Sequence, residues 1–267
     1  MKLTMLGTGN AVVTECYNTC FVLQEGERFL LVDGGGGNTL LHQLKATGID
    51  WKEIREIFVT HAHMDHVMGI FWMIRMICQN MKRGSYEGEA VIYCHAELAE
   101  LLNTVPRMML SQQETAFLGD RLKIVPVEDG EERTVLGHHR MQFFDICSTK
   151  AKQFGFTLDI RPGEKLACCG DEPFYQGNAP EVQGSQWLLH EAFCLESQAE
   201  LFHPYEKHHS TVADACRLAQ RMQIPNLLLY HTEDRNLARR QELYRQEGQR
   251  YYSGNLLIPE DLDSILL

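Results

Sequence analysis

Three histidines and one aspartate lie within six consecutive residues, and this cluster restricts the fold more than any other feature of the chain: His61, His63, Asp65 and His66. The preceding residues, 54–60, are apolar-rich and typical of a β-strand, whereas residues 64–82 have the character of a helix. Ligands spaced by two residues point the same way from an extended backbone, and ligands that begin the helix can face a second ion. The sequence therefore predicts a strand-to-helix loop that binds two metal ions.

This spacing matches the HxHxDH signature of the metallo-β-lactamase superfamily, which the chain resembles along nearly its whole length. The closer resemblance is to the ribonuclease Z and phosphodiesterase branch, for reasons given below. It implies an α/β fold, a four-layer αββα sandwich with a dinuclear metal site at the edge between two sheets. Because there is no Pro/Gly/Ser-rich linker, low-complexity tract or internal repeat, we expect a single domain over residues 1–267.

Two further strand ends supply ligands if the resemblance holds. Residues 166–171 form an apolar run that ends in Gly-Asp, and in the family the aspartate at this place, here Asp171, bridges both ions. A second apolar run, 227–230, ends at His231, which matches the last ligand of the family. The second metal site is then expected to contain four residues: Asp65, His66, His231 and the shared Asp171.

A glycine run at residues 34–37 opens a predicted helix after a strand. It lacks the Lys-Ser/Thr of a phosphate-binding P-loop and the spacing of a dinucleotide fingerprint, so phosphate binding is not favoured there. In the family the preceding aspartate, here Asp33, braces the metal loop, and the glycines let the backbone pass close to it.

The first metal site departs from the family pattern. In the family, the first two histidines of the loop and the bridging carboxylate are joined by a third histidine at the end of a strand. Here that strand is followed by Cys147 in the expected position, although an alignment shifted by two residues puts Thr149 there. A thiolate is a good zinc ligand, so we predict Cys147 as the third ligand. In the alternative interpretation, Cys147 is a small core residue and the first site is weak or empty.

A possible acid-base pair comes from two short boxes that resemble those of ribonuclease Z. The segment 190–192 resembles its His-Glu-Ala-Thr box, and 209–211 resembles its His-Ser-Thr box. In the family the glutamate and histidine are hydrogen-bonded beside the metals, and the histidine protonates the leaving oxygen, which assigns these roles to Glu191 and His209. The chemistry is reasonable, because an imidazole titrates near neutral pH and a carboxylate can hold its tautomer. The Ser-Thr pair also reads simply as a helix N-cap.

The substrate class follows from what the chain lacks. Ribonuclease Z has a long tRNA-binding arm, which is inserted in the sequence between the third-histidine strand and the Gly-Asp strand. Here only a short hairpin fits between Cys147 and Asp171. The net charge of -11 also argues against binding a long nucleic acid, which needs clustered Lys and Arg. We therefore do not expect tRNA processing and favour a small or short phosphodiester.

The predicted activity is that of a metal-dependent hydrolase with two divalent ions, zinc being favoured over manganese or iron. The ions would activate water as a hydroxide for attack on phosphorus, Asp65 would orient it, and His209 would protonate the leaving group. One alternative is a carboxylic ester, lactone or thioester hydrolase. Another is a non-catalytic metal-binding protein whose first site was degraded when Cys147 replaced histidine.

The sequence also bears on location and assembly. The N-terminus runs directly into a strand-like pattern without an apolar signal core, and nine cysteines are scattered without a secreted-scaffold pattern. We expect a cytoplasmic protein with no membrane insertion. The methionine-rich helix at 64–82 is interpreted as a helix buried in the core or at a homodimer contact, in preference to a substrate-binding methionine surface.

Overall fold

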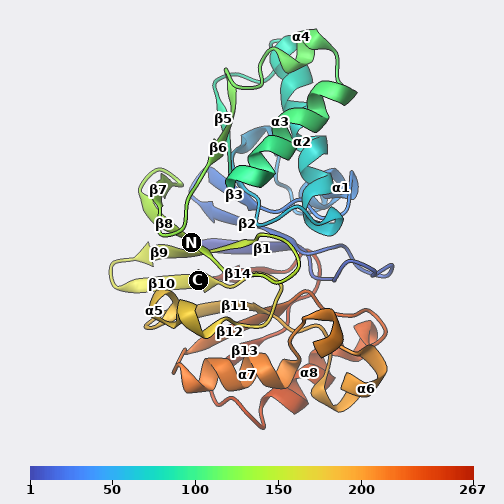
Figure 1. The fold of residues 1–267 in the computed structure, drawn as a ribbon, viewed down its shortest axis with the longest axis vertical. Helices are drawn as coiled ribbons and strands as arrows, with labels where there is room; N and C mark the ends of the chain where they lie inside the picture. Colours follow the sequence, from blue (N-terminus) through green and yellow to red (C-terminus); the bar gives the residue numbers. More distant parts are fainter.

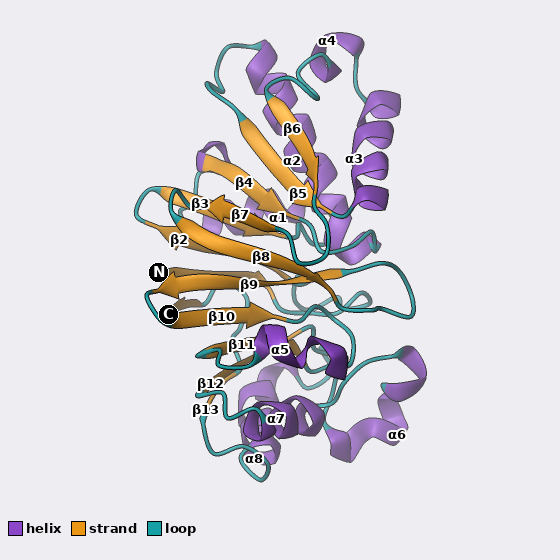
Figure 2. Ribbon diagram, turned by 60° about the vertical axis from the view of Figure 1, so that its left-hand side comes forward, coloured by secondary structure: helices purple, strands orange, loops and turns teal.

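A computed structural model describes residues 1–267 and shows two mixed β-sheets packed face to face between two layers of helices (Figure 1). Each sheet has seven strands, in the orders β14-β1-β2-β3-β4-β5-β6 and β13-β12-β11-β10-β9-β8-β7. Figure 2 shows the strands of both sheets stacked in the middle of the molecule. This is the αββα sandwich that the resemblance implied.

The first sheet is formed by the N-terminal half of the chain and one C-terminal strand. Its strands are β1 (Lys2–Gly7), β2 (Cys20–Glu25), β3 (Arg28–Val32), β4 (Ile54–Phe58), β5 (Ala90–Cys94), β6 (Leu122–Pro126) and β14 (Ser264–Leu266). Its outer face is covered by helices α1 (Thr39–Ala46), α2 (Met64–Lys82) and α3 (Ala96–Met109), with the short α4 (Gln112–Thr115) beside them. From β3 to β6 neighbouring strands are parallel, so their carboxyl ends lie at one edge.

The second sheet is formed by the C-terminal half. Its strands are β7 (Glu132–Val135), β8 (His139–Asp145), β9 (Phe154–Arg161), β10 (Glu164–Cys168), β11 (Trp187–Glu191), β12 (Asn226–Tyr230) and β13 (Asn255–Leu257). The helices are α5 (Ala179–Val182), α6 (Ala199–Phe202), α7 (Val212–Arg221) and α8 (Arg240–Gly248). Strands β10 to β13 are parallel, and β9 and β10 form the short antiparallel hairpin expected between Cys147 and Asp171.

The strands form as they do because each sheet packs an apolar core against both of its faces, and the core between the sheets is shared. In β1, Leu3 and Met5 pack between the sheets, whereas Leu6 faces the helices, in keeping with the two-residue period of a strand. Strands buried on both faces read as nearly continuous apolar runs, and β12 is such a run. Burial on both faces fixes the register of each strand and hence the place where it ends.

Helix α2 begins within the metal-binding loop and is anchored by close backbone packing. Its glycine, Gly69, lies so near the turn after β3 that a Cβ atom there would be only 1.8 Å from the Gly34 carbonyl oxygen. Along the helix, Met73 and Met81 are buried in the core, whereas Met64 is 72% exposed. The methionines thus mainly fill the core, and the close approach fixes the first turn of α2 against β3.

The elements that the sequence did not predict are short: β7, β13, β14 and the helices α4, α5 and α6. Strand β14 is held by pairing with β1, and β13 by pairing with β12. None of the helices has both the length and the apolar character needed to cross a membrane.

Candidate metal centre

The candidate site lies where the carboxyl ends of strands from both sheets meet. Loops after β3, β4, β10 and β12 bring Asp33, the loop 61–66, Asp171 and His231 to one place. Two of these residues leave their strands in the left-handed region, Asp33 with φ 58° and His231 with φ 56°. That conformation is uncommon for residues other than glycine and concentrates at functional sites, where surrounding contacts hold it.

Asp33 fixes the orientation of two of the histidines. Its carboxylate accepts a hydrogen bond from the Thr60 hydroxyl at 2.7 Å and lies 2.7 Å from His66 Nδ1. Because the Thr60 hydroxyl donates its single hydrogen to Asp33, it can only accept from His61 Nδ1, which is 2.9 Å away. In their neutral forms both imidazoles therefore carry a hydrogen on Nδ1 and present the lone pair of Nε2 to the site, as metal-binding histidines do.

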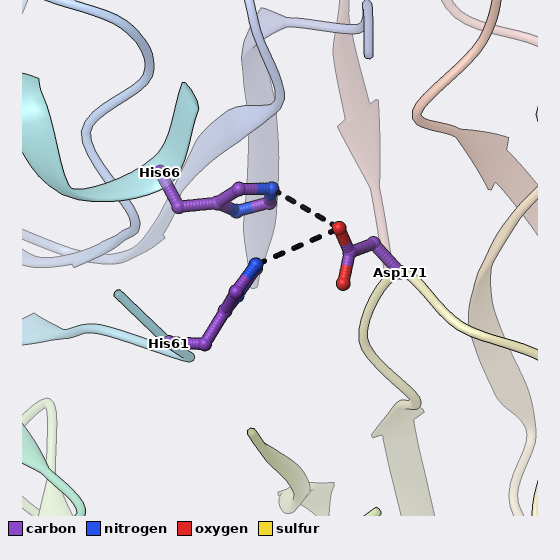
Figure 3. Close-up of side chains that lie close together, drawn as sticks. All are labelled: His61, His66 and Asp171. Atoms are coloured by element: carbon purple, nitrogen blue, oxygen red, sulfur yellow. Dashed lines mark ion pairs between the residues drawn. The ribbon is translucent and has the colours of Figure 1, made fainter. Parts of the chain in front are cut away.

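Asp171 faces the rings of His61 and His66 (Figure 3). Its Oδ2 atom is 3.6 Å from His61 Nε2, 3.4 Å from His66 Nε2 and 3.4 Å from His231 Nε2. The preceding Gly170 has φ 75°, and a Cβ atom there would lie 2.7 Å from Gln153 Nε2, so the turn that presents Asp171 favours glycine. One carboxylate thus faces ligands of both expected metal sites.

The side chains expected at the second metal site lie close together. Asp65 Oδ2 lies 3.3 Å from His231 Nε2 and 3.4 Å from His66 Nε2. These three side chains are all buried. Together with Asp171 they form the set of two imidazoles and two carboxylates that the sequence predicted for this site.

The first metal site has two of its predicted imidazoles, and His61 Nε2 and His63 Nδ1 are 2.9 Å apart. The structure does not bring Cys147 to them. Its side chain is exposed, its Sγ lies 3.9 Å from the Asp145 carbonyl oxygen, and no cluster of close metal-ligand side chains includes it. The physical reason is the backbone, because Cys147 follows β8 with φ 57° and so turns out of the strand direction. Thr149, the alternative position, is exposed as well.

A lysine and a glutamate that sequence reasoning did not single out lie beside this first site. Lys150 Nζ is 3.4 Å from His209 Nε2 and 3.8 Å from Glu172 Oε1. Burial lowers the pKa of His63, the charges of Asp171 and Asp65 oppose this shift, and the charges of His66 and Lys150 add to it. The only signal in the sequence was that Glu172 directly follows the predicted bridging carboxylate.

Glu191 and His209 are brought together next to the second metal site. His209 Nδ1 lies 2.6 Å from Glu191 Oε2, and the other carboxylate oxygen accepts from the Ser210 backbone N–H at 2.7 Å. The His209 ring stacks on Phe193 at 4.7 Å between centroids and lies 5.2 Å from His231. Burial opposes the charged imidazole, but the hydrogen bond and charge of Glu191 outweigh it and raise the pKa of His209.

The donor set fits divalent metal ions on grounds of charge and unused hydrogen-bonding capacity. Burial disfavours the charged form of His66, but the carboxylates of Asp65 and Asp33 outweigh it and raise its pKa well above the ordinary value. Burial also opposes ionisation of Asp171, yet the surrounding imidazoles hold its pKa well below the usual range. His66 Nε2 and Asp171 Oδ1 are buried without a hydrogen-bond partner. Such buried carboxylates and free imidazole nitrogens are stabilised when they bind a cation.

Comparison with known proteins defines the class first. The structure resembles the metallo-β-lactamase-fold protein YhfI from Bacillus subtilis, with a TM-score of 0.78 and 16% identity over 99% of this chain and 98% of that one. It also resembles human tRNase Z, short form, with a TM-score of 0.77 and 19% identity over 100% and 99% of the two chains. Ribonuclease Z of Synechococcus sp. (strain CC9902) is 26% identical over 317 aligned positions, covering 98% of this chain and 91% of that relative. The chain is a metal-dependent hydrolase of the metallo-β-lactamase fold.

The particular family follows from a profile match. The profile described as Anti-Pycsar protein Apyc1 matches residues 1–252, which is nearly the whole chain. The chain therefore belongs to the Anti-Pycsar protein Apyc1 family.

Proposed function

We propose that this protein is a phosphodiesterase that acts on a small or short phosphodiester with two divalent metal ions, most suitably zinc. Asp65, His66, His231 and Asp171 would hold one ion, and His61 and His63 would hold the other with the shared Asp171. Imidazole and carboxylate ligands suit zinc, and manganese or iron also accept them. When bound, such ions activate the attacking water and neutralise charge that develops on the phosphoryl oxygens.

The observation that carries the proposal is the contact between Glu191 and His209. Glu191 is fully buried and accepts a hydrogen bond from His209 Nδ1. Nε2 is therefore the ring nitrogen of His209 that is left to face the site. Burial lowers the pKa of His209, but the hydrogen bond and charge of Glu191 raise it above its ordinary value, which favours the imidazolium form that can donate a proton from Nε2 to a departing alkoxide. An alkoxide is a poor leaving group, so hydrolysis of an alkyl phosphodiester benefits from such an acid. Asp65 would orient the attacking water.

The preference for a small substrate rests on the surface of the chain. The β9–β10 hairpin turns at residues 162–163, so no extended arm lies between Cys147 and Asp171. The net charge of -11 repels a polyanion, because each phosphate bound at a distance from the ions requires a nearby Lys or Arg. A short phosphodiester needs only the contacts at the centre itself.

The test is a comparison of substrates with the metal-loaded protein. We expect hydrolysis of bis-p-nitrophenyl phosphate to exceed that of p-nitrophenyl acetate and of simple lactones, relative to each uncatalysed rate. A precursor tRNA should be a poor substrate under the same conditions. If acetate or lactones are preferred and phosphodiesters are left intact, the protein is an ester hydrolase and the proposal fails.

A further inference from the structure

The segment after β8 departs from the family pattern, and it presents a positive charge to the site. Lys150 lies in this segment, its side chain is only 25% exposed, and its Nζ is 3.4 Å from His209 Nε2. Nζ also donates to the Lys207 carbonyl oxygen at 3.3 Å. The ammonium group is thus placed next to the atom that we assign to protonation of the leaving group.

A buried glutamate holds the segment that carries this ammonium group. Glu172 is 5% exposed and directly follows Asp171 in the chain. Its carboxylate accepts from the Ser148 hydroxyl at 2.6 Å and from the Thr149 backbone N–H at 3.1 Å. Lys150 Nζ is 3.8 Å from the same carboxylate. Glu172 therefore ties the segment 148–150 to the strand end that presents the bridging carboxylate.

The ammonium group of Lys150 has only long contacts in the free protein. It has three hydrogens to donate, and it contacts the Lys207 carbonyl oxygen at 3.3 Å, His209 Nε2 at 3.4 Å and the Glu172 carboxylate at 3.8 Å. The distance to Glu172 is too long for a direct hydrogen bond. An anion that enters the site beside His209 can therefore accept a shorter hydrogen bond from Nζ. A phosphoryl oxygen is the anion that the proposed reaction brings to this place.

We propose that Lys150 is a phosphate-binding residue that donates to a non-bridging oxygen of the substrate, beside His209 on the leaving-group side. This inference rests on the proposed function, because a carboxylic ester carries no such anionic oxygen. The same charge would select anionic phosphodiesters over neutral esters. A non-bridging oxygen is anionic before and during the reaction, so Lys150 stabilises the bound substrate and the transition state alike.

The kinetic test compares Lys150→Met, Lys150→Arg and a matched surface control, Lys152→Met. Lys152 is two residues away, is 41% exposed and loses the same charge on substitution. For bis-p-nitrophenyl phosphate we expect Lys150→Met to raise KM about tenfold and change kcat little, because it removes one charge-assisted hydrogen bond. Lys150→Arg should recover most of the affinity, and Lys152→Met should behave as the parent.

A binding measurement keeps this inference separate from the proposed function. Isothermal titration calorimetry of inorganic phosphate into the metal-loaded proteins should show about tenfold weaker binding for Lys150→Met and near-parental binding for Lys150→Arg. Phosphate binding can be compared among these variants even if the parent protein cleaves no phosphodiester. In that case only the proposed function fails. Unchanged phosphate binding in Lys150→Met overturns the inference. So does an equal loss in Lys152→Met, or a loss in Lys150→Met that arginine fails to restore.

Discussion

In both halves of the metal centre the expected ligands come from the ends of strands, but the two halves differ in how many of these strand ends face the site. In the second half, Asp65, His66 and His231 are all buried and face Asp171 from both sheets. In the first half, His61 Nε2 and His63 Nδ1 lie 2.9 Å apart, but the third strand end turns outward at Cys147 and leaves it exposed. The second half is thus closed by protein ligands, whereas the first half is open on one side.

This difference shows what holds a ligand in position. His61 and His66 are oriented by the buried carboxylate of Asp33, directly in one case and through Thr60 in the other. Cys147 has no comparable partner, since its backbone N–H bonds only to Asp145 two residues earlier. On the open side the chain presents Lys150 and Glu172 instead of a third imidazole. An open position with a cation beside it suits a site that must admit an anionic substrate.

The largest effect is expected at the residue that both halves share. Asp171→Asn removes the charge that faces three imidazoles, and metal ions in such sites contribute several kcal/mol to catalysis, so activity should fall by about 10³-fold or more. Metal content, measured by mass spectrometry, should fall in parallel. The exposed Asp120→Asn serves as the control. Full metal content and activity in Asp171→Asn would show that the two halves do not meet at this carboxylate.

The next largest effect on turnover is expected at His209, the proposed general acid beside the second half. His209→Ala should lower turnover of bis-p-nitrophenyl phosphate by about 10²–10⁴-fold, the usual contribution of general acid catalysis. Metal content should stay near that of the parent, which separates a lost acid from a lost ion. Because p-nitrophenolate leaves easily, the loss should be larger still with a substrate that has a simple alkyl leaving group. Unchanged turnover with both substrates would remove His209 from the mechanism.

A pH profile sharpens the same assignment. The acid must be protonated, so activity that depends on His209 is present below its pKa and is lost as the pH rises through it. Glu191 raises this pKa by its hydrogen bond and its charge, against the effect of burial. Glu191→Gln should therefore move the alkaline limb of kcat to lower pH, with the remaining limb unchanged. A limb that stays in place would mean that Glu191 does not control the protonation of His209.

The smallest effect is expected at the strand end of the first half. Cys147 is exposed, and burial together with the carboxylates of Asp145 and Asp129 raises the pKa of its thiol, which disfavours the thiolate. Cys147→Ala should change metal stoichiometry and turnover by less than about twofold, as surface substitutions usually do. A clear loss of one ion per chain would restore Cys147 as the third ligand and close the first half.

Much of the fold and most of the metal centre could be predicted from local sequence. Helix α2 spans residues 64–82 and β12 spans 226–230 as the apolar patterns indicated, because periodicity and burial act over a few neighbouring residues. The histidine loop stands out by its own spacing, whereas Asp171, His231, Glu191 and His209 were predicted only through the resemblance to the family, each at the end of such a segment or in a short box.

Only the tertiary structure decided the features that depend on distant partners. Strand β14 is three residues long and exists because it pairs with β1 across the length of the chain. Lys150 contacts His209, and Glu172 contacts the segment after β8. These contacts suggest a role at the site, and no local sequence pattern marks either residue. The same holds for Cys147, whose alignment with the family suggested a ligand. The direction in which a chain leaves its strand is set by one backbone torsion and its surroundings, which residue types alone do not encode.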